Sequence, residues 1–264
     1  MFAEVQSVEA LSPTMLRVTL AGGTLDQFEA SSATDAYINA RFLPQDSPLA
    51  VPFDDDAIAA VASEHRPRPR RFTVRRWEEE SNTMIIDFVA HGDVGYAGAW
   101  AARAVPGDRL QFTGPGGSYQ PSPDVDWHLF VGDESAFGGI GASLERLTEG
   151  ERALVFVVVD SPDHEVDFPT SGDVHIVWLY RDASEAPEEL LVDAVAAAEF
   201  PTGTFDVFVH GEAGEVRAVR RHLVAEHQVD VGAASISPYW RRKHTDEAWR
   251  SIKREWLAEQ ANDV

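Results

Sequence analysis

The period of the hydrophobic pattern changes part-way along the chain, and this change constrains the fold more than any other feature. Up to about residue 122, short segments alternate apolar and polar side chains, as at Leu16, Val18 and Leu20. Such alternation is typical of antiparallel strands with one buried face. The segments with this pattern are residues 15–20, 37–42, 71–77, 83–91 and 109–112. We therefore expect an antiparallel β-barrel in the first part of the chain.

From Trp127 onward, the apolar residues form continuous runs in place of alternating ones. These runs are residues 129–131, 153–159, 174–180 and 205–209. Continuous runs are expected of strands that are buried on both faces of a parallel sheet. Helical stretches separate them, at residues 140–147, 187–198 and 215–227. This strand–helix alternation predicts a Rossmann-like open parallel α/β sheet.

The boundary between the two patterns is marked by Pro121-Ser122-Pro123, which suits a linker. We therefore expect two domains, residues 1–122 and 123–264. Residues 50–70 are acidic and then rich in proline and arginine, which predicts a long surface loop.

A C-terminal helix is expected over residues 245–259. At helical spacing it places four apolar residues on one face, which is predicted to be a docking face. These residues are Trp249, Ile252, Trp256 and Leu257.

The charge of the chain limits its partners. There are 22 lysines and arginines against 44 aspartates and glutamates, so the formal net charge is −22. Such a chain repels nucleic-acid phosphates, and no nucleic-acid partner is expected. Lys243 and Lys253 are the only lysines, so an anionic ligand has to be met mainly by arginines.

Several classes of site and location are disfavoured. The chain has no cysteine, which excludes disulfides, thiolate catalysis and iron–sulfur clusters. His222 and His227 are five residues apart and do not share a helix face, so no metal site is expected. The first residues lack a basic and then apolar leader, and the longest apolar run is well below the ~18 residues of a membrane helix. A cytoplasmic monomer without stable membrane association is expected.

Arg70-Arg71-Phe72-Thr73-Val74-Arg75 combines cations, an aromatic ring and a hydroxyl on one predicted strand. A guanidinium can hold a pyrophosphate while the ring and the hydroxyl lie along a flat cofactor. An edge strand with solvated arginines is the alternative. The segment resembles the Arg-x-Tyr-Thr-x-Arg flavin segment of the siderophore-interacting, FAD-dependent ferric reductases. The resemblance implies that Arg70 and Arg75 lie beside the flavin and that Phe72 and Thr73 touch its ring.

Residues 91–101 end a predicted strand, turn at glycines and begin a helix, where free N–H groups can bind a pyrophosphate. They resemble the His-Gly-x-x-Gly-Pro-Ala-x-x-Trp-Ala block of the same family. A strand-end histidine without a ligand is the alternative for His91. Tyr96 and Gly98 depart from the family pattern, at positions where proline and serine are common. The resemblance implies that six residues bind FAD: His91, Gly92, Asp93, Gly95, Ala97 and Trp100.

Two turns in the second half resemble the nicotinamide-binding side of the family. Asp133 and Ser135 lie in a segment similar to Gly-Asp-Glu-Thr-Ala, and Gly211-Glu212 resembles a Gly-Glu turn whose acid lies near the nicotinamide and the flavin. No Gly-x-Gly-x-x-Gly fingerprint is present. The donor is expected to be NADPH or NADH. NADPH is favoured slightly, because four arginines are candidates for a ribose 2′-phosphate: Arg181, Arg217, Arg220 and Arg221.

The segment Tyr239-Trp240-Arg241-Arg242-Lys243 is similar to the Tyr-Trp-Arg-rich tail of these reductases. The resemblance implies that Trp240 packs near the flavin. It also implies a set of cations that hold a ferric chelate: Arg41, Arg241, Arg242 and Lys243. Asn39 stands where the family often has a lysine, which weakens this set and favours neutral or weakly anionic chelates.

The resemblance covers nearly the whole chain. The family that the chain resembles is one of the ferredoxin-reductase-like flavoenzymes. The resemblance implies an FAD-dependent oxidoreductase that passes electrons from NAD(P)H through FAD to a ferric siderophore, with no catalytic acid or base in the protein. Two alternatives stay open. One is a general NAD(P)H:flavin or quinone oxidoreductase. The other is a non-catalytic siderophore-binding protein, which the departures at Phe72, Tyr96, Gly98 and Asn39 keep open.

Overall fold

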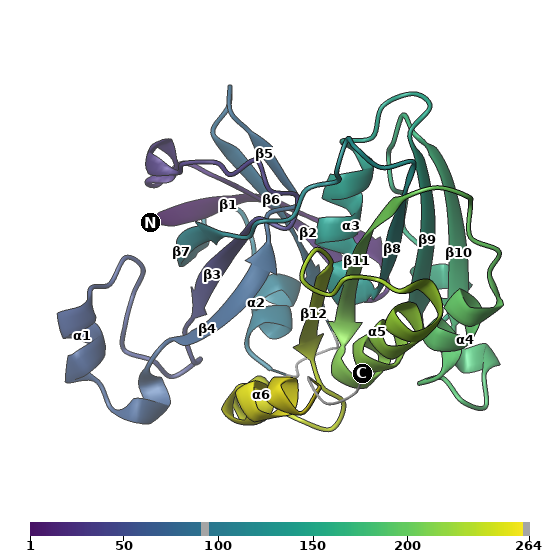
Figure 1. The fold of residues 1–264 in the computed structure, drawn as a ribbon. Coiled ribbons are helices and arrows are strands. Elements are labelled where there is room, and N and C mark those ends of the chain that lie inside the picture. The colour runs from purple at the N-terminus through teal and green to yellow at the C-terminus, as the bar shows by residue number, and fades with distance from the viewer. Residues whose placement is uncertain (91–94, 261–264) are drawn as a thin grey trace. The chain divides into compact units, whose positions relative to one another are not determined.

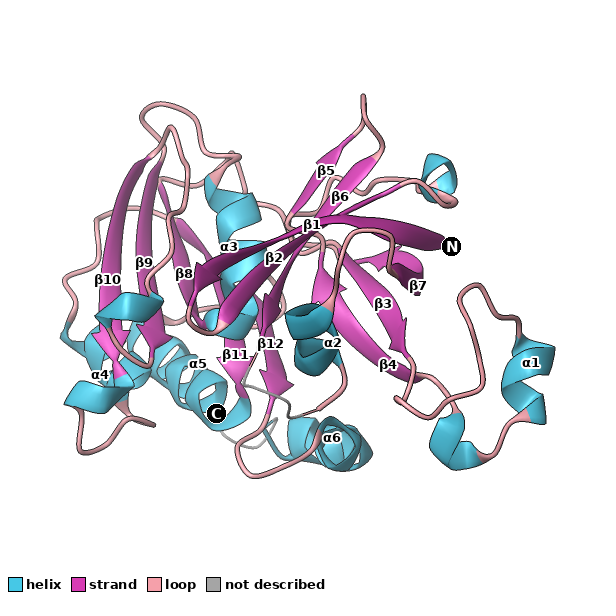
Figure 2. Cartoon of the chain, turned by 180° about the vertical axis from the view of Figure 1, so that it is seen from behind, coloured by secondary structure: helices cyan, strands magenta, loops and turns pink. Residues whose placement is uncertain are grey.

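The computed structural model describes residues 1–90 and 95–260 (Figures 1 and 2). The chain divides into two compact units, Met1–Gln120 and Pro121–Val264. Within the described residues, no helix is both long enough and apolar enough to cross a membrane.

The first unit is built on a seven-stranded antiparallel sheet with the order β4-β3-β7-β1-β2-β6-β5. The antiparallel β fold expected from the alternating pattern is confirmed. The strands are β1 (Phe2–Ser12), β2 (Met15–Ala21), β3 (Tyr37–Phe42), β4 (Arg68–Thr73), β5 (Arg76–Glu78), β6 (Thr83–Val89) and β7 (Arg109–Gly116). Two short helices, α1 (Asp55–Ala60) and α2 (Ala97–Arg103), accompany the sheet.

The two end strands of this sheet, β4 and β5, are consecutive in the sequence and are joined by Val74 and Arg75. The N–H of Val74 donates to the carbonyl of Ala36, just before β3, at 2.7 Å. The N–H of Arg75 donates to the carbonyl of Ile85 on β6 at 2.9 Å. The two edges of the sheet therefore meet at this link, where the sequence pattern had predicted one continuous strand over residues 71–77.

The interior of the first unit contains the apolar members of the alternating segments. On β3, Ile38, Ala40 and Phe42 are buried, while the residues between them are half-buried. The predicted loop over residues 50–70 is wrong in part, because it contains α1 and the start of β4. Asp54 begins α1 by accepting a hydrogen bond from the N–H of Ala57 at 2.8 Å.

The second unit has a five-stranded parallel sheet with the order β10-β9-β8-β11-β12, which confirms the expected open α/β fold. Its strands are β8 (Trp127–Asp133), β9 (Arg152–Val159), β10 (Asp173–Tyr180), β11 (Phe205–Glu212) and β12 (Ser235–Trp240). Its helices are α3 (Phe137–Leu144), α4 (Leu190–Ala197), α5 (Ala213–His227) and α6 (Asp246–Gln260). Short 3₁₀ turns follow β8, β9 and β10. The apolar pattern of the sequence did not predict strand β12.

Helices cover both faces of this parallel sheet (Figure 1). One face packs against α4 and α5, through residues such as Val131 of β8 and Val219 of α5. The other face carries Phe208, whose ring would lie 2.8 Å from a Cβ added at Gly139 of α3. Because successive side chains of a strand point to opposite faces, both sets must be apolar. This is why the strands of the second unit are continuous apolar runs.

Helix α6 packs its indole rings against the start of α5. Trp249 and Trp256 are 2% and 8% exposed and form an apolar cluster with Ala213 and the half-buried Ile252. Leu257 is 40% exposed. The predicted docking face is therefore correct for the tryptophans and for Ile252, and wrong for Leu257.

Candidate functional site

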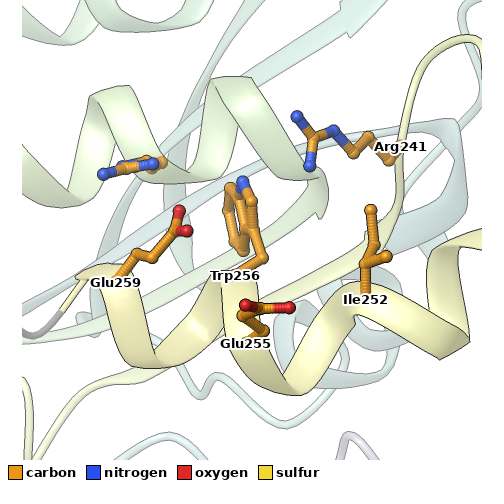
Figure 3. Close-up of a pocket in the computed structure, with 6 residues that line it drawn as sticks. Arg241, Ile252, Glu255, Trp256 and Glu259 are labelled. Atoms are coloured by element: carbon orange, nitrogen blue, oxygen red, sulfur yellow. The ribbon is translucent and has the colours of Figure 1, made fainter.

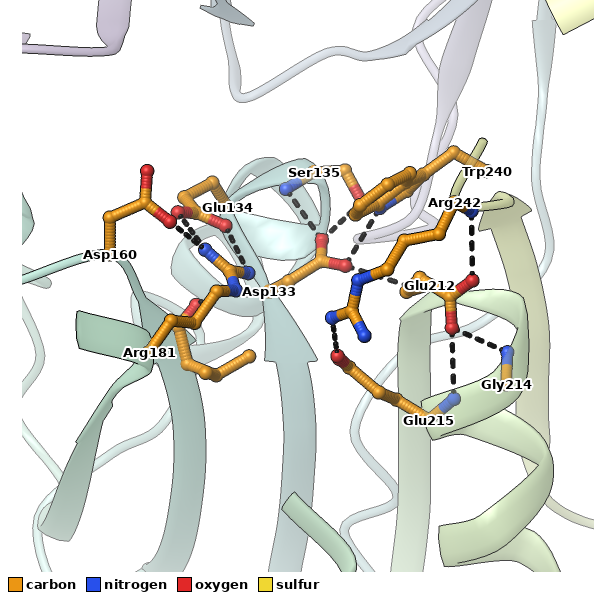
Figure 4. Close-up of polar contacts among 11 residues, drawn as sticks. Asp133, Glu134, Ser135, Asp160, Arg181, Glu212, Gly214, Glu215, Trp240 and Arg242 are labelled. Atoms are coloured by element: carbon orange, nitrogen blue, oxygen red, sulfur yellow. Dashed lines mark hydrogen bonds and ion pairs between the residues drawn. The ribbon is translucent and has the colours of Figure 1, made fainter. Parts of the chain in front are cut away.

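The carboxyl ends of the parallel strands in the second unit carry most of the polar residues singled out in the sequence. Strand β8, the first strand of this sheet along the chain, lies in the middle of the sheet, with β9 and β10 on one side and β11 and β12 on the other. The connections therefore diverge between β8 and β11, and such a switch point is where open α/β sheets bind ligands. Asp133 ends β8 and Glu212 ends β11 at this position (Figure 4).

Asp133 is a buried carboxylate that joins the ends of three strands. Its Oδ1 accepts hydrogen bonds from the N–H and the hydroxyl of Ser135, at 2.8 and 2.5 Å. Its Oδ2 accepts from the N–H of Glu212 at 2.7 Å and from the indole N–H of Trp240 at 2.8 Å. Burial and the neighbouring charge of Glu134 raise the pKa of Asp133 above its usual range. The structure thus brings together Asp133, Ser135, Glu212 and Trp240, four of the residues predicted from the sequence.

Gly211 is required by the close approach of Asp133. Its φ is +146°, and a Cβ added there would lie 2.7 Å from Oδ2 of Asp133. A side chain at residue 211 would therefore collide with the carboxylate that holds Trp240. The glycine predicted as cofactor-binding has at least this local role.

Glu212 holds the start of α5 and the C-terminal segment at once. Its Oε2 accepts from the N–H groups of Gly214 and Glu215, at 2.5 and 3.1 Å, which caps the helix. Its Oε1 accepts from the backbone N–H of Arg242 at 3.0 Å. The carboxylate is 5% exposed, so it serves chiefly to position these two segments.

Glu215, in the first turn of α5, was missed by the sequence analysis. Its Oε1 forms an ion pair with the guanidinium of Arg242, while its Oε2 is buried without a hydrogen-bond partner among the described residues. Burial and the charge of Asp133 raise the pKa of Glu215 to about 7, against the opposing effect of Arg242. The sequence does contain a signal that could have identified Glu215: it is a second acid shortly after the Gly-Glu turn, in the first turn of a predicted helix.

His210 anchors the Tyr-Trp segment inside the second unit. Its Nδ1 lies 2.7 Å from the hydroxyl of Tyr239, and its Nε2 lies 2.9 Å from the hydroxyl of Ser235. Burial lowers the pKa of His210 to about 3, so the ring is neutral. Tyr239 is thereby tied to β11.

The three predicted cations of the C-terminal segment do not converge on one point. Arg241 lies over the rings of Trp249 and Trp256, at 5.9 and 5.8 Å. Arg242 pairs with Glu215, and Lys243 is exposed with a φ of +62°. Beside Arg241 is a pocket of about 310 Å³ (Figure 3). It is lined by Arg217, Arg241, Ile252, Glu255, Trp256 and Glu259.

In the first unit, Arg70 and Phe72 lie on one face of β4, next to α2. The guanidinium of Arg70 is 5.6 Å from the ring centre of Tyr96. The ring of Phe72 is 4.4 Å from that of Phe88, which is 5.7 Å from that of Trp100. The half-buried rings of Phe72 and Trp100, beside a guanidinium group, suit a cofactor with a flat ring and a pyrophosphate. The residues present therefore fit FAD.

The other predicted flavin residues lie in different surroundings. Thr73 follows Phe72 on β4 and so points to the opposite face of the sheet. Arg75 is 4% exposed, and its Nε lies 3.9 Å from Oδ2 of Asp87. Gly95 has a φ of +80°, and Ala97 begins α2 and is 8% exposed. His91, Gly92 and Asp93 lie outside the described residues.

On β3, Asn39 and Arg41 are half-buried and share the face that the strand turns away from its buried residues. A guanidinium nitrogen of Arg41 lies 3.7 Å from a carboxylate oxygen of Asp55, whose side chain is 95% exposed. Such an exposed pair is weak, so it leaves Arg41 able to exchange partners.

Comparisons with known proteins cover both units. Residues 4–119 match a family described as "Siderophore-interacting FAD-binding domain", and residues 125–243 match one described as "Siderophore-interacting protein". The chain is 33% identical to the "Ferric vibriobactin reductase ViuB" of Vibrio cholerae, over 90% of this chain and 88% of that protein. It is 30% identical to the "NADPH-dependent ferric-chelate reductase" of Escherichia coli, over 90% and 92%.

A solved structure gives the same result. The crystal structure of the siderophore-interacting protein SipS from Aeromonas hydrophila is similar over 98% of each chain, with a TM-score of 0.82 and 26% identity. Similar sequence and similar fold therefore extend through both units. The chain belongs to the family of siderophore-interacting proteins with an FAD-binding domain.

Proposed function

We propose that this protein is an FAD-dependent ferric-siderophore reductase that takes electrons from a nicotinamide dinucleotide. The observation that carries the proposal is the pairing of two units in one chain. The first matches a siderophore-interacting FAD-binding domain, and the second has a parallel sheet with polar side chains at its switch point. Relatives that are similar over both units are named ferric reductases.

In the first unit, FAD is assigned to the face of β4 next to α2. Arg70 and Phe72 hold its pyrophosphate and ring there, together with Trp100. Gly95 and Ala97 complete the proposed site, as do His91, Gly92 and Asp93. Thr73, on the opposite face of β4, and Arg75, buried beside Asp87, are proposed to support the strand that carries Arg70 and Phe72. FAD, when bound, supplies the conversion of a two-electron hydride transfer into single-electron transfers.

In the second unit, the nicotinamide dinucleotide is assigned to the switch point. Phosphates are bound after the first strand of such sheets, where Ser135 lies. The hydroxyl and N–H of Ser135 both donate to Asp133, so the proposed role of Ser135 is to shape this turn. Asp133 holds the indole of Trp240, and Glu212 holds the backbone at Arg242. These two acids and Gly211 therefore orient the segment that we assign to the cofactor's reactive end.

The substrate is a ferric chelate, for which Arg41, Arg241, Arg242 and Lys243 are the proposed cations. Glu215 balances the charge of Arg242, so the set attracts anions less strongly than its count of cations suggests. Neutral or weakly anionic chelates are therefore favoured. Oxygen ligands that suit Fe(III) hold Fe(II) weakly, so reduction releases the metal and needs no acid or base from the protein. We place the reaction in the cytoplasm and the protein as a monomer.

An anaerobic spectroscopic experiment tests this function. The purified protein is saturated with FAD, then NADH or NADPH is added, followed by a ferric hydroxamate and a ferrous chelator. We expect the flavin absorbance to bleach with the nucleotide and to return as the ferrous complex forms. Bleaching with transfer only to quinones or free flavin would indicate a general oxidoreductase. A protein that binds the ferric chelate but not FAD would be a carrier.

Variants sharpen the assignment of the flavin site. Arg70→Gln removes a cation from the face of β4 next to α2. We expect it to weaken FAD binding by at least about tenfold, since a charge-assisted hydrogen bond to a phosphate is lost. Arg76→Gln is the matched control, because Arg76 is exposed and pairs with Glu78 at 2.6 Å. Equal FAD affinities of the two variants would contradict the proposed site.

A further inference from the structure

A carboxylate, that of Asp160, follows β9 at the position where dinucleotide-binding sheets bind the adenosine ribose. The strands β8, β9 and β10 are the first, second and third of the sheet, in the spatial order third-second-first. In such sheets an acid after the second strand accepts the ribose 2′-hydroxyl of NADH, and a nearby arginine accommodates the 2′-phosphate of NADPH. Asp160 directly follows β9, and Arg181 directly follows β10.

The arginine at this place is already engaged by acids of the same unit (Figure 4). The terminal nitrogens of Arg181 donate to the two carboxylate oxygens of Glu134, at 2.7 and 2.8 Å. They also donate to the carboxylate of Asp160 at 2.9 Å and to the carbonyl of Val158 at 3.4 Å. All N–H groups of these two nitrogens are thus used. Burial alone would lower the pKa of Arg181, but the acids outweigh it and raise that pKa, so the cation is firmly held.

Releasing Arg181 for a phosphate would be costly. Its side chain is 17% exposed and that of Glu134 is 6% exposed, so the pair is largely removed from water. Turning the guanidinium away would leave the carboxylate of Glu134 buried and unpaired, which is strongly unfavourable. By contrast, the side chain of Asp160 is 50% exposed and can reach a ligand.

Two further acids lie in the segments next to Asp160 and Arg181. The N–H of Asp182 donates to the carbonyl of Asp160 at 3.0 Å, and Glu165 accepts from the hydroxyl of Tyr180 at 2.5 Å. The Nδ1 of His164 lies 2.9 Å from the hydroxyl of Ser161. A 2′-phosphate bound at the end of β9 would meet the carboxylate of Asp160, and the two negative charges would repel each other.

The other arginines considered for a 2′-phosphate lie elsewhere. Arg217, Arg220 and Arg221 are on α5, which follows β11, and β8 separates β11 from β9 in the sheet. Arg220 is 8% exposed and donates to the carbonyl of Gln260 at 3.3 Å.

We propose that Asp160 determines donor specificity by accepting the adenosine ribose hydroxyls of NADH, while Arg181, held by Glu134, is withheld from the 2′-phosphate of NADPH. This rests on the proposed function, and it makes NADH the donor. It reverses the slight preference for NADPH that the arginines alone suggested, and it distinguishes this chain from the relative named as NADPH-dependent.

The test is calorimetric binding of NAD⁺ and NADP⁺ to the FAD-saturated protein, which needs no turnover. We expect NAD⁺ to bind at least about tenfold more tightly, because hydrogen bonds to a charged group are gained and repulsion is avoided. Asp160→Ser should weaken NAD⁺ binding and strengthen NADP⁺ binding. Glu134→Gln combined with Asp160→Ser should release Arg181 and strengthen NADP⁺ binding further. Asp173→Asn is the matched control, since Asp173 is exposed at the opposite end of β10 and carries the same charge.

Each outcome has one meaning. Tighter NADP⁺ binding by the unchanged protein would overturn the inference and leave the reductase function intact. Equal effects of Asp160→Ser and Asp173→Asn would show that net charge alone matters, and would also overturn it. Binding of neither nucleotide would overturn both the inference and the nucleotide site of the second unit. Preference for NAD⁺ that is lost only in the Asp160 variants supports the proposal.

Discussion

Among single residues, Glu215 carries a charge that opposes folding at neutral pH. The carboxylate is 2% exposed, and Asp133 and Glu212 add negative charge around it, while Arg242 and Arg181 oppose them. The pKa in the folded protein is about 7, against a reference value of 4.5. The folded state therefore holds this proton more tightly than the unfolded chain does between these two pH values.

This shift predicts a stability that depends on pH. Because the folded pKa is raised, the contribution of Glu215 is fully present below about pH 4.5 and is lost as the pH rises through about 7. Glu215→Gln should therefore increase the free energy of unfolding at pH 8 by about 1–3 kcal/mol. The increase should vanish near pH 4, below the reference value of 4.5, where Glu215 is protonated in the folded and the unfolded chain alike. Urea denaturation at both pH values measures the difference.

The matched control for this prediction is Glu226→Gln, an exposed acid on the same helix. It should change the stability by less than about 0.5 kcal/mol at either pH. A Glu215→Gln protein that is less stable than the unchanged protein at pH 8 would show that the ion pair with Arg242 outweighs the cost of burial.

At the scale of elements, α6 is attached to the second unit mainly by its two tryptophans. The ring of Trp249 is 5.3 Å from that of Trp256, and both cluster with Ala213 of α5. The same cluster supports Arg241, whose guanidinium lies over both rings. Docking of α6 therefore also positions the C-terminal cations.

Truncation of α6 residues should separate buried from exposed positions. Trp249→Ala removes a ring that is 2% exposed, and it should lower the free energy of unfolding by about 3–5 kcal/mol. Leu257→Ala, at a residue 40% exposed, should change it by less than about 0.5 kcal/mol. Chemical denaturation gives both values, and hydrogen exchange should show faster exchange in α6 for the first variant only. Equal effects would mean that the helix is not docked in solution.

At the scale of the whole molecule, the net charge of −22 is the dominant feature. Carboxylates far outnumber cations, so their mutual repulsion destabilises the compact state, and salt screens it. Raising NaCl from about 0.05 to 0.5 M should increase the Tm by about 2–4 °C, which corresponds to roughly 1 kcal/mol. Differential scanning calorimetry measures the shift. A Tm that falls with salt would mean that specific ion pairs, such as that of Arg181, contribute more than general repulsion.

Much of the fold followed from the sequence alone. The change from alternating segments to continuous apolar runs predicted the antiparallel sheet and then the parallel one. Alternate side chains of a strand point to opposite faces, so a strand with one buried face alternates and a strand with two buried faces is apolar throughout. Five segments also resembled one family. The strands β1 and β12 were missed because polar and small residues interrupt their apolar pattern, as do Ser235, Ser237 and Pro238 in β12.

The environment of the site residues was decided only by the tertiary structure. The sequence identified Asp133, Glu212, Trp240 and Arg181 as candidates. It did not show that Asp133 accepts a hydrogen bond from the indole of Trp240, or that Glu134 pairs with Arg181. These contacts depend on the spatial order of the strands, which brings the ends of β8, β11 and β12 together although they are far apart in the chain. Periodicity is a local property and determines which face of a strand is buried. The partners of residues at strand ends depend on non-local packing. A residue's type and position in the sequence could therefore identify it as a candidate, while its charged partners and its exposure became clear only in the folded protein.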